Sequence, residues 1–432
     1  MIKLKSRLKK LLPIIFLEDY YSYKSRKAEE KKYKSLMIQT QLHYKDVEKK
    51  IKNKGRPIRF ASYVIFDSTF CAYNIMNYML QNKDEYSPKI VIIPDVSRGK
   101  LHMVEQYEKT KSFFLNKYGT EYVLDGYDII NNTFFDYSDD FDIVYLANPY
   151  DSMVNKVHSI KYISKKNILP IYLSYGCHVD RYSCHTIIPL LEISLFWKVF
   201  ADNVISFKDY KKYELLHGKN VVLSGYAKMD ELSNYKKIDN KQKTIIIAPH
   251  HTINMQSLPL SNFLDNYDFI LELPKMYPDI KFIFRPHPLL FVNMVNEGHW
   301  TIEQVNQYIR KLESLGVYYS FGGDYLDTFV QSDAIIHDCS SFVVEYLYTG
   351  KPCCFFAKEN YKLVFSKLGK SCLKYYYLAF NRKQICDFID NIVLKNNDPL
   401  FKKRTKFVKE KISINYPNSS SKILSEINKI TL

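Results

Sequence analysis

The stretch that decides the fold is Ser332-Asp-Ala-Ile-Ile-His-Asp-Cys-Ser-Ser-Phe-Val-Val-Glu-Tyr-Leu-Tyr-Thr-Gly-Lys-Pro352. Residues 334–336 are a short apolar run between polar residues, which predicts a buried parallel strand. A polar cluster follows it: His337, Asp338, Ser340 and Ser341. A helical pattern starts at Phe342, so hydroxyls and free backbone N–H groups fall where an anion can bind. Ligands of open α/β sheets bind at this end of the strands. The stretch predicts a phosphate-handling α/β protein.

Short apolar runs alternate with helical patterns along the whole chain, which indicates parallel sheets covered by helices on both faces. Runs expected as strands in the first half are 58–66, 89–94, 141–146, 168–173, 204–207 and 221–223. Those in the second half are 243–248, 280–284, 316–320, 334–336 and 353–356. A chain of 432 residues is too long for one ordinary core, so two domains are expected.

The same patterns predict where the domains begin and end. The first Rossmann-like domain is expected at 57–230 and the second at 244–400, with a polar, Lys-rich linker at 231–243. A basic helical segment at 1–56 precedes them. Helices in 401–432 are expected to pack back across both domains.

Charge is concentrated near the start of the chain. The sequence has 62 Lys and Arg against 46 Asp and Glu, a net charge of +16, and residues 1–60 alone hold 18 basic and 6 acidic residues. No zinc finger or aromatic RNA-binding motif favours nucleic acid. We therefore expect an anionic membrane surface as partner, with residues 1–17 as a basic amphipathic helix on it. An ordinary solvated helix face is the alternative.

The expected location is the cytoplasm, at the inner face of the cell membrane. No segment reaches the roughly 18–20 apolar residues that span a bilayer, and the run at 11–17 is too short and charged at its end for a signal peptide. The eight cysteines are irregularly spaced, which is typical of reduced cytosolic thiols.

Arg285-Pro-His-Pro288 follows a predicted strand, and its prolines restrict the loop that carries Arg285 and His287. Arginine offers a planar donor fork to phosphate, and histidine can donate to a leaving oxygen. A rigid turn with an incidental ion pair is the alternative.

Two further histidine segments follow strands. Ala248-Pro-His-His-Thr252 places His250, His251 and Thr252 as ligand-facing groups. A metal reading is disfavoured because adjacent residues point in different directions and no third ligand lies nearby in sequence.

Gly176 to His185 holds two Cys-His dipeptides, whose spacing matches no closed zinc site. We expect a loop that presents His178, beside Asp180, as a general base. A plain surface histidine is the alternative.

Two more residues are candidates for the donor site. Gly225 permits a tight turn at the end of a strand. Glu345 can accept hydrogen bonds from a ribose or polyol, or can instead interact locally within its helix. No P-loop, dinucleotide glycine fingerprint, kinase set or Gly-x-Ser-x-Gly elbow is present.

These motifs resemble the CDP-glycerol glycerophosphotransferase family, which includes teichoic-acid primases and polymerases, over roughly residues 170–360. The motifs are Gly225-Tyr226 with Asp230, Ala248-Pro249, Arg285-Pro-His-Pro288 and the block from Ser332-Asp to Lys351-Pro352. The resemblance implies a GT-B architecture, in which two Rossmann-like domains face each other across a cleft. It implies transfer of glycerol or ribitol phosphate from a CDP-activated donor to a lipid-linked or surface glycan, such as capsule, teichoic acid or lipopolysaccharide. CMP is released, and no metal or cofactor is expected.

The resemblance also implies residue roles. His287, Ser340 and Ser341 would contact the donor pyrophosphate, with Arg285 nearby, and Asp338 stands at the family's acidic position. The family's first-domain His-Gly pair is replaced by Tyr175-Gly176, so His178 is the candidate base, and His250-His251 stands where Thr-Trp is usual. A GT-B glycosyltransferase and a catalytically inactive membrane-bound scaffold are the alternatives.

Overall fold

The computed structural model describes residues 14–238, 241–255, 258–322 and 325–431. The chain divides into two compact units. Unit 1 comprises the described residues of Met1–Gly176, Cys184–Asp230 and Ile414–Leu432. Unit 2 comprises those of Cys177–Ser183 and Glu231–Ser413. Each unit therefore contains a segment from a distant part of the sequence.

Unit 1 is built on a parallel sheet with the strand order β3-β2-β1-β6-β7-β8-β9. Its strands are β1 (Ile58–Val64), β2 (Tyr86–Ile92), β3 (Val123–Asp125), β6 (Ile143–Leu146), β7 (Leu169–Leu173), β8 (Lys198–Ala201) and β9 (Val221–Leu223). Alternate residues of β1 enter two hydrophobic clusters, Phe60 one and Ala61 the other, so both faces of the sheet are covered. A short hairpin, β4 (Tyr127–Asp128) and β5 (Thr133–Phe134), lies outside this sheet.

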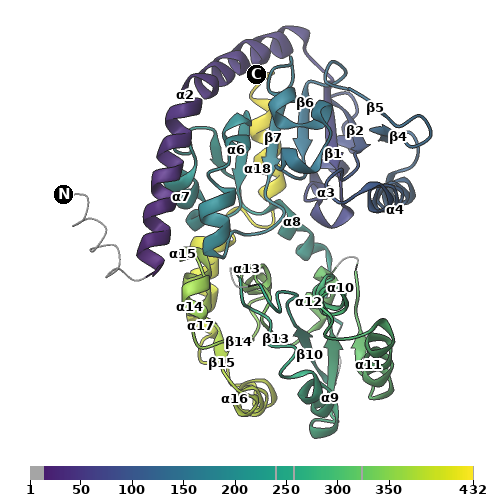
Figure 1. Cartoon of the computed structure of the whole chain (residues 1–432), viewed down its shortest axis with the longest axis vertical. Helices are drawn as coiled ribbons and strands as arrows, with labels where there is room; N and C mark the ends of the chain where they lie inside the picture. The colour runs from purple at the N-terminus through teal and green to yellow at the C-terminus, as the bar shows by residue number, and fades with distance from the viewer. Residues whose placement is uncertain (1–13, 239–240, 256–257, 323–324, 432) are drawn as a thin grey trace, which may run out of the picture. The chain divides into compact units, whose positions relative to one another are not determined.

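The helices of unit 1 cover that sheet. They are α2 (Ile14–Lys54), α3 (Tyr73–Gln81), α4 (Lys100–Tyr118), α5 (Ile160–Ile163), α6 (Leu191–Leu195), α7 (Val204–Tyr213), α8 (Ala227–Asp230) and α18 (Ser419–Asn428). The long helix α2 runs along one side of the unit (Figure 1). It buries Met37, Tyr44, Val47 and Ile51, and the Tyr44 hydroxyl donates to the Leu195 carbonyl.

Unit 2 contains a second parallel sheet, in the order β12-β11-β10-β13-β14-β15. Its strands are β10 (Lys243–Ala248), β11 (Ile280–Phe284), β12 (Tyr318–Tyr319), β13 (Ala334–His337), β14 (Cys353–Phe356) and β15 (Tyr377–Ala379). Numbered along the chain, this is the 3-2-1-4-5-6 order of the Rossmann fold, which reverses direction between β10 and β13. Ligands of such sheets bind at that reversal, beyond the carboxyl ends of the strands.

The helices of unit 2 lie on both sides of its sheet (Figure 1). They are α9 (Tyr267–Met276), α10 (Leu290–Asn296), α11 (Ile302–Ser314), α12 (Leu326–Gln331), α13 (Phe342–Glu345), α14 (Tyr361–Val364), α15 (Lys367–Leu373), α16 (Arg382–Phe388) and α17 (Phe401–Phe407). Lys237, in the segment predicted as a linker, pairs with Asp333 at 2.5 Å, so this segment packs on unit 2. Two residues of that segment, 239–240, lie outside the described residues.

The prediction of an α/β fold with two Rossmann-like units is confirmed, and one predicted strand is wrong. Residues 204–207 begin helix α7. The Asn203 side chain accepts hydrogen bonds from the N–H groups of Ile205 and Ser206, both at 2.9 Å, and so caps the helix. The neighbouring strand is β8, which the sequence analysis did not identify.

Among the described residues, none of the helices combines the length and the apolar character that crossing a membrane requires. The predicted amphipathic helix at 1–17 falls largely outside the described residues. The eight cysteines form no disulfide, and seven of them are buried.

Candidate active site

The carboxyl ends of three neighbouring strands bring the predicted loops together. Past the end of β11, the Arg285 N–H donates to the Ile247 carbonyl at 2.8 Å and the His287 N–H donates to the Pro249 carbonyl at 3.0 Å. On the other side of β10, the Asp338 N–H donates to the Ala248 carbonyl at 3.4 Å. The pairing of the strands therefore continues into the loops, at the point where the strand order of unit 2 reverses.

Three imidazole rings converge there. The ring centroids of His250 and His251 are 4.4 Å apart, those of His251 and His287 are 4.1 Å apart, and those of His250 and His287 are 5.2 Å apart. One nitrogen of each ring lies within 4.8 Å of one nitrogen of both others. The adjacent histidines thus do face one site, and His287 from the next loop completes the group.

Each of these rings is held through its Nδ1 atom. The Leu289 N–H donates to Nδ1 of His287 at 3.1 Å. The Asn293 amide donates to both Nδ1 and the carbonyl of His251, each at 3.1 Å. For His250 the partner is a hydroxyl, Oγ1 of Thr252 at 2.8 Å. That oxygen also accepts the Leu260 N–H at 3.3 Å, and as a hydroxyl it can either donate to the ring nitrogen or accept from it.

Burial keeps the three rings neutral. Burial, together with a smaller effect of the nearby His251, lowers the pKa of His287 to about 3. Burial also lowers the pKa of His251 and lowers that of His250 well below its ordinary value. A neutral imidazole carries one proton. In His251 and His287 the Nδ1 atom accepts a hydrogen bond, so that proton lies on Nε2 and each of these two rings offers one N–H donor.

This protonation pattern favours an anion over a metal ion. A metal binds an unprotonated ring nitrogen. In His287 and His251 the unprotonated nitrogens are already engaged by Leu289 and Asn293. The remaining Nε2–H groups are donors, which suit phosphate oxygens.

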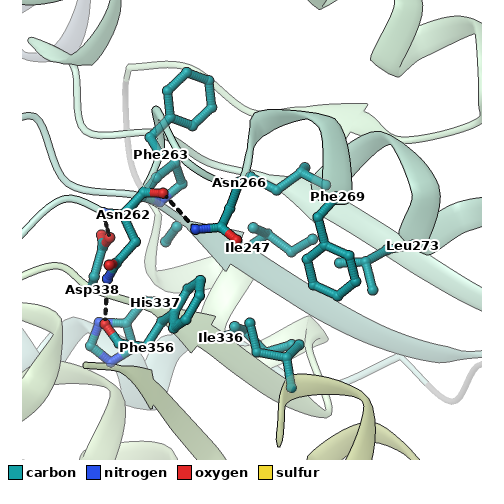
Figure 2. A pocket seen from close by; sticks show the side chains of 14 residues that line it. Ile247, Asn262, Phe263, Asn266, Phe269, Leu273, Ile336, His337, Asp338 and Phe356 are labelled. Atoms are coloured by element: carbon teal, nitrogen blue, oxygen red, sulfur yellow. Dashed lines mark hydrogen bonds between the residues drawn. The ribbon is translucent and has the colours of Figure 1, made fainter. Parts of the chain in front are cut away.

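Asp338 contacts the backbone of the loop that carries His250. Its carboxylate accepts the His250 N–H at 2.5 Å and the Asn262 N–H at 2.7 Å, and the side chain is almost fully buried (Figure 2). Burial raises its pKa to about 7. The Asp338 carboxylate therefore fixes the backbone of this loop. Both of its oxygens accept hydrogen bonds from protein N–H groups.

A cavity lies beside Asp338 and Asn262, between the sheet of unit 2 and helix α9. Figure 2 shows its apolar lining, which includes Ile247, Phe269, Leu273 and Ile336. Its volume is about 40 Å³. That is room for a few water molecules at most, since one needs roughly 10–15 Å³ by this measure. The cavity is therefore packing space and too small for a nucleotide.

The side chains of Arg285 and Glu345 make hydrogen bonds to other protein groups near the site. The Arg285 guanidinium donates to Oγ of Ser320 at 2.6 Å and to the Gly322 carbonyl at 2.8 Å, and it lies 5.2 Å from the Tyr325 ring centroid. The Tyr325 hydroxyl donates to the buried carboxylate of Glu345. The two predicted donor ligands are thus linked to each other through Tyr325.

Ser340 and Ser341 form the turn that precedes α13, two and three residues beyond Asp338. Both are partly exposed. Ser341 makes no side-chain cap to the helix. Within the described part of the chain, no hydrogen-bond partner is found for either hydroxyl. They remain available to a ligand at the reversal of the strand order.

Two predicted site residues are not among the contacts of this group. Gly225 is in unit 1 with φ +89°, and a Cβ there would stand 2.1 Å from the Ile414 carbonyl oxygen. Its glycine character is explained by packing against the C-terminal segment. His178 belongs to unit 2, in the segment Cys177–Ser183, and is mostly buried. The other Cys-His dipeptide is separate, since His185 pairs with Asp19 of α2 at 3.0 Å.

Asn293 and Asn262 were missed by sequence analysis. Asn293 orients His251, and Asn262 binds Asp338 while its amide donates to the Phe356 carbonyl at 2.8 Å. Neither lies in a recognisable motif, and each acts on a residue more than 40 positions away. No motif or periodic pattern in the sequence identifies these two asparagines.

A family model described as CDP-Glycerol:Poly(glycerophosphate) glycerophosphotransferase matches residues 210–429, just over half of the chain. The chain belongs to this family. It is an enzyme that transfers a polyol phosphate from a CDP-activated donor to a surface glycan. The matched range contains every predicted site residue except His178.

Solved structures show a similar fold across nearly the whole chain. The wall teichoic acid polymerase TagF is 13% identical with a TM-score of 0.54, and the match covers 95% of this chain and 98% of that one. The UDP-GlcNAc 2-epimerase from Neisseria meningitidis is 15% identical with a TM-score of 0.52, over 86% and 99% of the two chains. No curated protein sequence matches the chain. At these identities the likeness shows the GT-B-like fold alone.

Proposed function

We propose that unit 2 binds the pyrophosphate of a CDP-polyol donor through the N–H groups of His250, His251 and His287. The observation that carries this is the convergence of three neutral imidazoles whose Nδ1 atoms are each hydrogen-bonded to a protein group. The Ser340 and Ser341 hydroxyls add donors at the same edge of the sheet. Neutral donors fixed in a buried site stabilise developing phosphate charge without reorganisation. Arg285, Asp338 and Glu345 hold these loops in place.

The proposed reaction is an in-line displacement. His178 removes the proton from an acceptor hydroxyl, whose oxygen attacks the β-phosphorus of the donor. The bond between that phosphorus and the bridging oxygen breaks, and the electron pair leaves on CMP. The imidazoles and the serine turn stabilise the charge on both phosphates. The polyol phosphate is left as a new phosphodiester on the acceptor.

The proposed setting is the cytoplasmic face of the cell membrane, with a lipid-linked or surface glycan as acceptor. The outer face of α2 supports this. Lys24, Lys31 and Lys34 are exposed there, as are Tyr20, Tyr21 and Tyr23. Lysines attract anionic headgroups, and tyrosines are enriched at membrane interfaces.

Released nucleotide tests the proposal. Purified protein is incubated with CDP-glycerol, CDP-ribitol or UDP-sugars and a surface-glycan extract, and nucleotides are separated by chromatography. We expect CMP, released only when acceptor is present, from one of the two CDP-polyols. Release of a nucleoside diphosphate would instead establish glycosyl transfer. Donor binding without turnover of any donor would favour the inactive scaffold.

A further inference from the structure

The segment Cys177–Ser183, which carries His178, belongs to unit 2, although the residues on both sides of it belong to unit 1. Strand β7 ends at Leu173 in unit 1, and the chain returns to unit 1 at Cys184. We call this segment the His178 loop. Its partners within unit 2 decide where the candidate base is held.

Main-chain contacts hold the His178 loop on both sides of Val179. Asp180 and Phe365 form an antiparallel bridge. The Ser366 N–H donates to the Val179 carbonyl at 2.8 Å, and the Ser366 hydroxyl donates to the His178 carbonyl at 3.0 Å. Val179 is fully buried. The loop is therefore attached through an isolated antiparallel bridge and two hydrogen bonds from Ser366, with its backbone fixed at His178 itself.

Helix α15 approaches the loop closely because residue 369 is glycine. A Cβ at Gly369 would stand 2.4 Å from the Val179 carbonyl oxygen and 2.5 Å from a ring carbon of Phe365. The same helix begins at Ser366, whose hydroxyl accepts the Gly369 N–H at 3.3 Å. Ser366 thus caps the helix and binds the loop, and Gly369 lets the first turn of the helix lie against it.

We propose that Ser366 and Gly369 are positioning residues, which fix His178 to the unit that binds the donor. This inference rests on the proposed function, in which His178 is the base. Its consequence is that the base and the phosphate-binding histidines belong to one compact unit. Their geometry is then set within unit 2, whereas unit 1 is left to supply the acceptor.

Two variants test the inference. Ser366→Ala removes the hydrogen bond to the His178 carbonyl, and Gly369→Ala forces the helix and loop apart. We expect kcat to fall about fivefold for Ser366→Ala, the worth of one hydrogen bond, and more for Gly369→Ala. The Kd for CDP-glycerol, measured by calorimetry, should stay unchanged. Ser366→Thr keeps the hydroxyl and should restore kcat.

Thr301→Ala is the matched control, because Thr301 caps α11 of the same unit through its hydroxyl and lies outside the site. It should leave kcat unchanged. Normal kcat in both test variants overturns the inference. So does an equal loss in the control, or a parallel loss of donor affinity, since either means general destabilisation.

His178→Asn separates this inference from the proposed function. Full turnover of that variant rejects the base, and the positioning role with it. Loss of turnover there, combined with normal rates for Ser366→Ala and Gly369→Ala, rejects the positioning role alone.

Discussion

An uncharged imidazole still donates one hydrogen bond, and the direction of that donor decides what His250, His251 and His287 contribute. In His251 and His287 the Nδ1 atom is occupied by a protein donor, so the N–H is on the other side of the ring. In the proposed reaction, fixed donors without charge suit a donor pyrophosphate that is cleaved and a CMP product that must be released after each turnover. A charged cluster would hold the product CMP more tightly.

His287→Gln and His287→Ala test this donor role. Glutamine carries an amide N–H at a reach similar to that of Nε2, whereas alanine carries none. We expect His287→Ala to lower kcat/KM by about 100-fold or more, as the loss of one transition-state donor does, and His287→Gln to lose clearly less. Steady-state kinetics with CDP-glycerol measure both. Equal losses in the two variants contradict the donor role.

The depressed pKa values predict a pH-dependent stability. His287 has a pKa of about 3 in the folded state, so the unfolded chain binds protons below pH ~6.5 that the folded chain does not. Its contribution is therefore constant above that pH and is lost as the pH falls. Asp338, with a pKa of about 7, acts in the opposite direction between pH ~4 and 7.

The measurement is urea unfolding of wild type and His287→Gln at pH 7 and pH 5. Between these values the wild-type free energy of unfolding should fall by about 2 kcal/mol more than that of the variant, at ~1.4 kcal/mol per pH unit for one proton. Identical pH dependence would mean that the pKa of His287 is not lowered in the folded protein.

The residue types of the site could be predicted from sequence, but their partners could not. The order of strand, loop and helix showed which end of the sheet His250, His287 and Asp338 occupy. The convergence of the rings depends on the pairing of β10 with β11, which joins residues about 37 positions apart. The ties of Arg285 to Ser320 and of Glu345 to Tyr325 depend in the same way on tertiary packing.

At the scale of elements, apolar runs predicted most strands because a strand buried on both faces has no polar side. The failure at 204–207 has the same origin. A four-residue, mostly apolar run fits the start of a helix as well as it fits a strand. The cap by Asn203 makes it the start of a helix. Strand β8 was missed because Lys198, at its start, separates its apolar residues from the apolar run that ends at Trp197.

The contact of Gly225 with the C-terminal segment yields an element-scale prediction. In Gly225→Ala the new Cβ meets the Ile414 carbonyl and Oγ of Ser419, at a backbone φ of +89°. We expect a loss of about 2 kcal/mol or more, because strain and a clash with backbone add. Gly298→Ala is the control, since φ there is +74° with open space around it. Chemical denaturation measures both, and equal losses would show that the contact with α18 is unimportant.

For the whole molecule, sequence predicted two domains and C-terminal helices that pack back across both, but not the crossing of the His178 loop. Ile414–Leu432 returns to unit 1, where the Asp230 carboxylate accepts the N–H groups of Ser419 and Ser420 at 3.1 and 2.7 Å. The His178 loop crosses in the other direction. The latter crossing leaves no trace in composition or periodicity, because it depends on which surfaces meet after the chain has folded.

The charge distribution of the whole molecule leads to a prediction about membranes. Replacing Lys24, Lys31 and Lys34 with glutamate reverses three exposed charges on α2. Each lysine near an anionic surface contributes about 1 kcal/mol, so binding to phosphatidylglycerol vesicles should fall at least 100-fold in a sedimentation assay. The same three substitutions at Lys402, Lys403 and Lys409, exposed in the other unit, give an equal net charge and should leave binding nearly unchanged. If both triple variants lose binding equally, net charge drives the attraction and α2 is an ordinary solvated helix.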